Sequence, residues 1–252
     1  IQPLKTGDDS RLAQIVSRRT THLGTKHSRR SCPARLVFST EQPIPSDDIL
    51  PGTSLMDMQL SDEHRALSAR SREFCEQVLQ PLELTVEENQ GLPKSEMPAL
   101  KAAVLDWGFA AINHSQEDGG AGYSLFEQTL INEQMGRATN GLWSCVWQPP
   151  ICLRDATAAQ KLKYLKPCCS GEFRGCFAIT EPGAGSDPRQ VKTNARESGN
   201  GFVINGDKWF VTSFGASQFI IVHAHVDDDP DKPTLFLVDR NTKGVQHVRS
   251  PH

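Results

Sequence analysis

Phe177-Ala178-Ile179-Thr180-Glu181-Pro182-Gly183-Ala184-Gly185-Ser186-Asp187 is the most informative stretch of this chain. Its first residues are apolar and predict a buried strand that ends in a loop. Gly183 and Gly185 let the backbone approach a ligand closely, and free amides in such a loop can hold an anion such as a pyrophosphate. Thr180 and Ser186 add hydroxyl groups that donate or accept hydrogen bonds. For an isolated motif, a plain glycine-rich strand connection is the commoner interpretation.

The chain that surrounds and follows this loop has the two-residue period of β-strands. Runs rich in Val, Ile, Phe and Thr predict strands at 175–180, 201–205, 208–212, 218–224, 234–238 and 245–249. Asn205-Gly206 stands between two of these runs and is a strong hairpin signal, because a type I′ turn needs a positive φ at both central residues. The sequence therefore predicts an antiparallel β region.

Upstream, from about residue 60 to 167, apolar residues recur at helical spacing. Ser124 with Glu127, and Thr157 with Gln160, have the spacing of a capping box at a helix start, and Pro81 ends or kinks the first helix. Helices followed by strands argue for an α+β chain. We expect an all-helical domain at 58–173 and an antiparallel, β-barrel-like and incomplete middle domain at 174–252.

The first 57 residues differ from the rest. No acidic residue occurs from Ser10 to Thr40, where arginines stand among many Ser and Thr. This composition is typical of a mitochondrial transit peptide, but it also suits a disordered tail, and we favour the tail. The expected location is therefore cytoplasmic, with the mitochondrial matrix as the alternative.

Composition excludes several classes of function. The formal net charge of −3 argues against a nucleic-acid binder, and no apolar run has the length of a transmembrane helix. The seven cysteines include no CxxC pair, so we expect thiols in a reducing compartment. His223 and His225 share one face of a strand, but no carboxylate or thiol nearby completes a ligand set. We therefore expect no metal site.

The 177–187 stretch resembles the TEPGAGSD-type signature of acyl-CoA dehydrogenases almost residue for residue. Further segments resemble that family's motifs in the family's order: 119–122 followed by Glu133, 160–165 followed by Gly171 and Glu172, and 202–212. Several linked motifs are far more specific than one. The resemblance runs from about Leu60 to the end. Departures at Asp118, at 188–190 and at 213–215 concern loop geometry and substrate preference.

The resemblance implies an FAD site. The implied cofactor-binding residues are Phe177, Ile179, Thr180, Gly185, Ser186, Phe210 and Thr212. By this resemblance Thr180 bonds the isoalloxazine ring, Thr212 bonds the flavin near the atom that accepts hydride, and Phe210 packs beside it. Ser186 lies near the pyrophosphate and also near the acyl-CoA, so it is the implied substrate-binding residue.

The resemblance also implies a flavoprotein oxidoreductase of fatty acid metabolism, which converts acyl-CoA to trans-2-enoyl-CoA. The family's C-terminal helical bundle carries the carboxylate base. We therefore expect the base beyond His252 and no catalytic residue within the chain, which by itself should be inactive. Implied partners are acyl-CoA, an acceptor such as an electron-transfer flavoprotein, and further copies of the chain. The alternatives are a non-catalytic flavin-binding or acyl-CoA-binding fragment and a flavin monooxygenase of the same fold.

Overall fold

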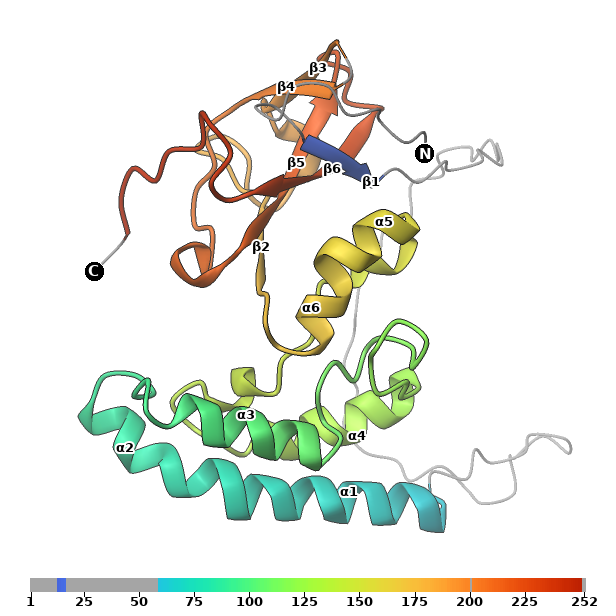
Figure 1. Ribbon diagram of the computed structural model, residues 1–252, viewed down its shortest axis with the longest axis vertical. Coiled ribbons are helices and arrows are strands. Elements are labelled where there is room, and N and C mark those ends of the chain that lie inside the picture. The colour runs from blue at the N-terminus through green and yellow to red at the C-terminus, as the bar shows by residue number, and fades with distance from the viewer. Residues whose placement is uncertain (1–12, 17–58, 200, 251–252) are drawn as a thin grey trace, which may run out of the picture.

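The structure, a computed structural model, describes residues 13–16, 59–199 and 201–250. Helices lie at one end of the molecule and a sheet at the other, with α5 and α6 between them (Figure 1). The helices are α1 (Asp62–Phe74), α2 (Glu83–Glu88), α3 (Met97–Asp106), α4 (Leu125–Met135), α5 (Ala158–Gln160) and α6 (Lys166–Cys169). The strands are β1 (Ala13–Val16), β2 (Gly175–Ala178), β3 (Asn194–Ser198), β4 (Gly201–Asn205), β5 (Phe219–Val226) and β6 (Pro233–Asp239). The predicted helical domain followed by a β domain is confirmed.

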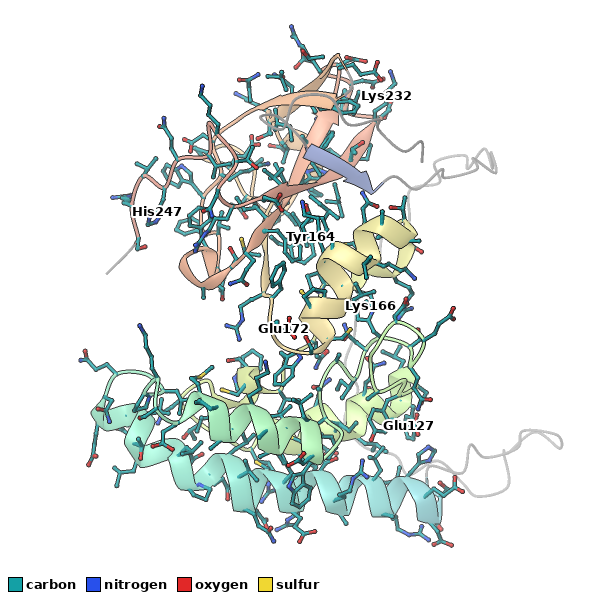
Figure 2. All side chains as sticks on the ribbon, in the orientation of Figure 1. Glu127, Tyr164, Lys166, Glu172, Lys232 and His247 are labelled. Carbon is teal, nitrogen blue, oxygen red and sulfur yellow. The ribbon has the colours of Figure 1, made fainter. Side chains whose placement is uncertain are left out.

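A helical segment joins the two parts, and Figure 2 shows Tyr164 between this segment and the sheet. α5 continues through a π-helical turn, Lys161–Leu165, into α6. The Tyr164 hydroxyl donates a 2.9 Å hydrogen bond to Asp239 at the end of β6, and its ring lies 4.7 Å from that of Phe219. Lys163 pairs with the same carboxylate at 2.7 Å. These contacts fix the sheet to the helical part.

The helix starts follow from local side-chain chemistry. The hydroxyl of Ser61 caps α1 by accepting from the amide of His64. Ser124 and Glu127 form a complete capping box at α4, and Thr157 does the same at α5. Each box satisfies two amides that have no partner within the helix. Both capping boxes predicted from spacing are therefore confirmed.

Pro81 bends the helical path but does not stop it. After α1 the chain passes through a π-helical turn, Cys75–Leu79, and a 3₁₀ turn, Gln80–Leu82, into α2. Pro81 lies in the first turn of the 3₁₀ segment, where a missing amide hydrogen costs little.

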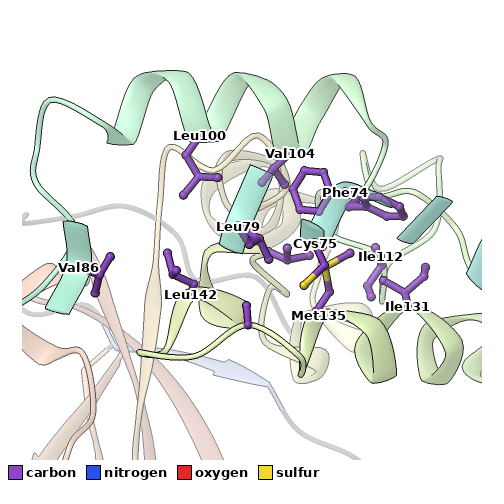
Figure 3. Packing of buried hydrophobic residues seen from close by; sticks show 13 residues of the cluster. Phe74, Cys75, Leu79, Val86, Leu100, Val104, Ile112, Ile131, Met135 and Leu142 are labelled. Carbon is purple, nitrogen blue, oxygen red and sulfur yellow. The ribbon is translucent and has the colours of Figure 1, made fainter. Parts of the chain in front are cut away.

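The core of the helical part forms between α1, α3 and α4 (Figure 3). Phe74 is fully buried, and its ring meets those of Trp107 at 5.6 Å and Phe109 at 5.2 Å edge to face. Leu79, Val104, Ile112, Ile131 and Met135 complete its centre. Burial of such a side chain contributes about 1.5–3 kcal/mol, which makes this cluster the main source of stability for the helices.

The sheet has the order β1-β6-β5-β3-β4, and β2 also pairs with β5. β6 is antiparallel to both β1 and β5, and β3 is antiparallel to β4. β2 and β3 both run parallel to β5. The sheet is thus mixed, and the prediction of a purely antiparallel region is wrong on this point. The reason is that β3 does not turn back to pair with β2. Instead, β3 pairs with the same edge of β5 as β2 does and runs in the same direction.

Two predicted strands do not form. Residues 208–212 are not in the sheet, because Lys208 and Trp209 bond to the carbonyls of Ile179 and Thr180 instead of continuing a ladder. Residues 245–249 also form no strand, and Val248 is 84% exposed. A strand was missed at β3, whose polar sequence lacks a β pattern, because its pairing with β4 depends on tertiary context.

The predicted hairpin at Asn205-Gly206 is also wrong. The hairpin lies one strand earlier, between β3 and β4, where Ser198 pairs with Gly201. Gly206 is needed for a different reason, because a Cβ atom there would overlap the side chain of Thr193.

The predictions of a tail and a transit peptide lie outside the described residues, apart from β1. That strand pairs with β6, with Ala13 opposite Val238. Within the described ranges, no helix is both long and apolar enough to cross a membrane.

Candidate functional site

The candidate site begins where β2 leaves the sheet. β2 pairs with the stretch of β5 from Phe219 to Val222, and β3 pairs with the same edge further along, at His225 and Val226. The loop 179–193 therefore starts at this edge of β5 and returns to the same edge, where β3 pairs with residues that lie further along β5. It contains most of the residues that sequence analysis singled out.

Within this loop, residues 181–184 form a tight turn that leaves several amides free. Glu181 and Ala184 exchange backbone hydrogen bonds of 3.0 and 3.1 Å. Among the described residues, the amides of Gly183, Gly185 and Ser186 have no partner. A Cβ at either glycine would meet nothing within 4 Å, so the turn faces open space. Neighbouring free amides of this kind bind anions.

A second segment, 206–212, runs beside the start of the loop. The amide of Trp209 donates to the carbonyl of Thr180 at 2.9 Å. Phe210 follows with a φ of 54° and is 75% exposed. A positive φ is a genuine outlier for a bulky residue, and it turns the chain so that the Phe210 ring meets that of Trp209 at 5.9 Å.

The Trp209–Thr180 hydrogen bond places two segments that carry the predicted residues side by side. We call the predicted residues of these segments the candidate wall: Phe177, Thr180, Ser186, Phe210 and Thr212. Phe177 is 40% exposed, and Ser186 and Thr212 are also exposed. Ile179 is half-buried beneath them, and Gly185 is exposed in the turn. The hydroxyls of Thr180, Ser186 and Thr212 have no hydrogen-bond partner among the described residues. Exposed aromatic rings with free hydroxyls suit a flat, largely apolar ligand with polar edges.

Glu181 does not face this surface, although it stands in the middle of the motif. Its carboxylate accepts from the amides of Lys192 at 2.6 Å and Thr193 at 2.9 Å, from the Thr193 hydroxyl, and from Lys208 Nζ at 2.8 Å. Burial raises the pKa of the Glu181 carboxyl, but these hydrogen bonds outweigh burial and lower its pKa to about 2. Glu181 is therefore a charged structural residue.

Sequence analysis did not single out Glu181 or Lys208. Their side chains are only 6% and 10% exposed, and Lys208 also donates to the carbonyl of Ile179 at 2.9 Å. The available signal was a charged residue directly after one strand-like run, Glu181, and another at the start of a second run, Lys208, since charges are almost never fully buried without a partner.

The histidine pair lies beside this ion pair. The rings of His223 and His225 are 5.6 Å apart, and among the described residues Nδ1 of His223 and Nε2 of His225 are buried without a hydrogen-bond partner. Burial lowers the pKa of His223, and the nearby charge of Lys208 lowers it further. Across the described ranges, no group of three or more ligating side chains surrounds a possible metal position.

At three positions that depart from the family pattern, Asp118, Pro188–Gln190 and Ser213, the structure shows a local contact or backbone conformation. Asp118 pairs with Lys161 at 3.0 Å and so ties the helical part to the joining segment. Asp187 accepts from the amide of Arg189 at 3.1 Å and caps a 3₁₀ turn, Pro188–Gln190. Ser213 adopts a positive φ of 65°.

The described cysteines are free thiols.

Two family models match most of the chain. Residues 61–172 match the N-terminal domain of acyl-CoA dehydrogenase, and residues 176–252 match its middle domain. Among curated proteins, the chain is 34% identical to a 3-(aryl)acrylate reductase of Clostridium sporogenes, over 75% of this chain and 51% of the relative. It is 29% identical to the mitochondrial short-chain specific acyl-CoA dehydrogenase of Bos taurus, over 77% and 48%. The chain spans about half the length of the curated relatives it matches.

Solved structures share the fold. A glutaryl-CoA dehydrogenase from Mycobacterium smegmatis in complex with FADH2 matches with a TM-score of 0.62 and 26% identity, over 73% of this chain and 47% of that one. The FAD complex of PigA matches with a TM-score of 0.65 and 26% identity, over 75% and 51%. The similarity therefore extends across the helical part, the sheet and the candidate wall.

Proposed function

This chain belongs to the acyl-CoA dehydrogenase family, and from that premise we propose that the candidate wall is one side of an FAD site in an acyl-CoA dehydrogenase. The observation that carries the proposal is the combination, in two adjacent segments, of an exposed, strained Phe210, free hydroxyls at Thr180 and Thr212, and free amides at Gly183, Gly185 and Ser186. FAD has a matching set of parts, since it joins a flat ring system to a pyrophosphate.

The residues present fit this cofactor. Phe177 and Phe210 offer apolar surface to the ring system, and the Thr180 and Thr212 hydroxyls are free to bond its polar edge. The turn around Gly183 has the open face and unpaired amides that a pyrophosphate requires. When bound, the flavin would accept hydride, and the protein would tune it through hydrogen bonds near the ring nitrogens.

The chain's own residues would bind, orient and exclude water. Thr212 would donate its hydroxyl to the ring, and Phe210 would shield the same region from solvent. Ser186 would lie where the pyrophosphate meets the acyl-CoA. Because no protein group in the described chain satisfies these hydroxyls, binding would exchange their hydrogen bonds to water for bonds to the ligand and would break none within the protein.

We propose acyl-CoA as the substrate class and α,β-dehydrogenation as the reaction. Removal of the α-proton needs a positioned carboxylate. The matched relatives are about twice as long as the region that this chain covers, so we place that base outside these 252 residues. We further propose that an electron-transfer flavoprotein is the electron acceptor, that the protein forms a homo-oligomer, and that it works in a reducing compartment.

A second candidate reaction is the reverse one, reduction of the double bond of an aryl-substituted acrylate or its thioester, for which reduced flavin would supply the hydride and a general acid the proton. The observation that favours it is the 34% identity to a 3-(aryl)acrylate reductase. A non-catalytic fragment and a flavin monooxygenase stay as alternatives. These functions are separated by assays of oxidation and of reduction on a chain extended with the C-terminal helical bundle that the family resemblance implies.

Cofactor binding is the direct test. Residues 1–252 should bind FAD only weakly, because one wall cannot supply every contact, and each missing bond to a charged group costs about 1.5–3 kcal/mol. An extended chain should purify yellow. Isothermal titration of the 252-residue chain with FAD should give an affinity that Phe210→Ala weakens further. Sub-micromolar binding would show that the wall is self-sufficient, and equal affinities would show that the flavin binds elsewhere.

A further inference from the structure

We propose that the buried Glu181–Lys208 ion pair is a positioning device, which holds the two segments of the candidate wall at a fixed relative position and so sets the affinity for flavin. The inference rests on the proposed function for the identity of the ligand. Neither side chain belongs to the wall itself, and both are nearly inaccessible to solvent.

The need for such a device follows from the sheet. The loop 179–193 leaves β5 opposite Val222 and rejoins it at His225, so the backbone between these points has no sheet ladder to hold it. The segment 206–212 is likewise outside the sheet. Both segments carry wall residues, yet neither has the regular hydrogen bonding that fixes a strand.

Glu181 closes the loop on itself. It stands near the start of the loop, and its carboxylate accepts from the amides of Lys192 and Thr193 at the end of the loop. The Thr193 hydroxyl donates to the same carboxylate. The part of the loop between Glu181 and Lys192 is therefore held between two points that one carboxylate joins.

Lys208 then ties the second segment to this closed loop. Its ammonium group donates to Glu181 at 2.8 Å and to the carbonyl of Ile179 at 2.9 Å. The next residue, Trp209, donates its amide to the carbonyl of Thr180 at 2.9 Å. Two successive residues of one segment thus bond two successive carbonyls of the other.

This attachment is what places the ring of Phe210. The residue follows directly after the two contacts and has the strained φ of 54°. A free segment would relax toward a negative φ, because such backbone strain persists only where the surroundings enforce it. Loss of the ion pair should therefore displace Phe210 and Thr212 relative to Thr180, without removing any group of the wall.

The experiment compares Lys208→Met, Lys208→Arg and the double variant Glu181→Gln/Lys208→Met with the unchanged 252-residue chain. A matched control is Lys161→Met, which breaks the 3.0 Å ion pair with Asp118 far from the wall. FAD affinity is measured from flavin fluorescence, and hydrogen exchange without flavin is measured at the bonded amides of Glu181 and Ala184 in the first segment and of Trp209 in the second. Thermal unfolding reports the global stability of every variant.

We expect Lys208→Met to weaken FAD binding by about tenfold or more, since small misplacements of binding groups have effects of this size. Exchange should rise in both segments together. Lys208→Arg should restore most of the affinity, and Lys161→Met should lower the unfolding temperature while leaving FAD affinity unchanged.

Equal loss of FAD affinity in Lys208→Met and Lys161→Met, at equal loss of stability, would overturn the proposal, because the pair would then act only through global stability. Unchanged exchange at the amides of Ala184 and Trp209 after Lys208→Met would also overturn it. Joint exchange changes with the same FAD affinity in every chain would support the positioning role and overturn the proposed function instead, because the flavin would then bind away from the wall.

Discussion

The amide of Trp209 donates a 2.9 Å hydrogen bond to the carbonyl of Thr180 and so joins the two sequence motifs that carry the candidate wall. The contact begins where β2 has ended, and it replaces the strand that sequence patterns predict at 208–212. Because of it, Thr180 and Phe210 belong to one surface although they are far apart in the chain.

The Thr212 hydroxyl should matter for flavin and not for folding. Thr212→Val keeps the volume and removes a hydroxyl that has no partner among the described residues, so the free energy of unfolding should change by less than about 0.5 kcal/mol. In a chain extended with the C-terminal helical bundle that the family resemblance implies, the flavin absorption spectrum should shift and reduction by substrate should slow. Thr212→Ser keeps the hydroxyl and is the control. An unaltered spectrum in Thr212→Val would remove Thr212 from the flavin site.

Replacement of Phe210 should preserve or raise the stability of the fold and weaken FAD binding. Phe210→Asn places a residue that tolerates positive φ at a position where the ring is 75% exposed. The folded chain should be as stable or about 1 kcal/mol more stable, because strain is relieved and little burial is lost. FAD affinity should fall. Urea unfolding and FAD titration of the same samples check both effects, and a variant that loses stability yet keeps its affinity would contradict the assignment.

Gly206→Ala should destabilise the chain, because the added methyl group overlaps Thr193. Overpacking of this kind costs about 1–3 kcal/mol. Gly183→Ala is the matched control, since a Cβ there meets open space and should leave the unfolding free energy nearly unchanged. Equal stabilities of the two variants would show that the Thr193 contact is not tight.

Acid should weaken the fold through Glu181. Its pKa lies at about 2, below the ordinary value of 4.5 expected for the unfolded chain. The stabilisation is therefore complete above about pH 4.5 and is lost as the pH falls toward 2. The shift corresponds to about 3 kcal/mol. Urea unfolding across this range measures the loss, and Glu181→Gln/Lys208→Met should show a shallower dependence on pH. Identical slopes for both chains would assign the acid sensitivity to other carboxylates.

The 252-residue chain should have no dehydrogenase activity with any acyl-CoA. A flavin wall without a positioned base cannot remove the α-proton. Steady-state assays with a dye acceptor across short, medium and long acyl-CoAs, with saturating FAD, provide the measurement. Flavin-dependent turnover by this chain would mean that the base lies within these residues.

Features that depend on neighbouring residues were predictable. The capping boxes at Ser124 and Thr157 form as their spacing predicts, because the bonding groups are three residues apart in the same helix turn. The strands β2, β5 and β6 were recognised from their apolar runs. The pairing partners of these strands could not be predicted, because the strands that pair with β5 include segments that are distant from it in sequence.

The sequence by itself determined the order of a helical domain and a β domain, and it placed a glycine-rich loop at the end of a buried strand. Only the tertiary structure decided that β2 and β3 share one edge of β5, that Gly206 packs on Thr193, and that Glu181 is buried against Lys208. The physical reason is distance along the chain. A capping bond or an apolar period is set by residues within one or two turns, whereas a parallel ladder or a buried ion pair forms only after distant segments have come together.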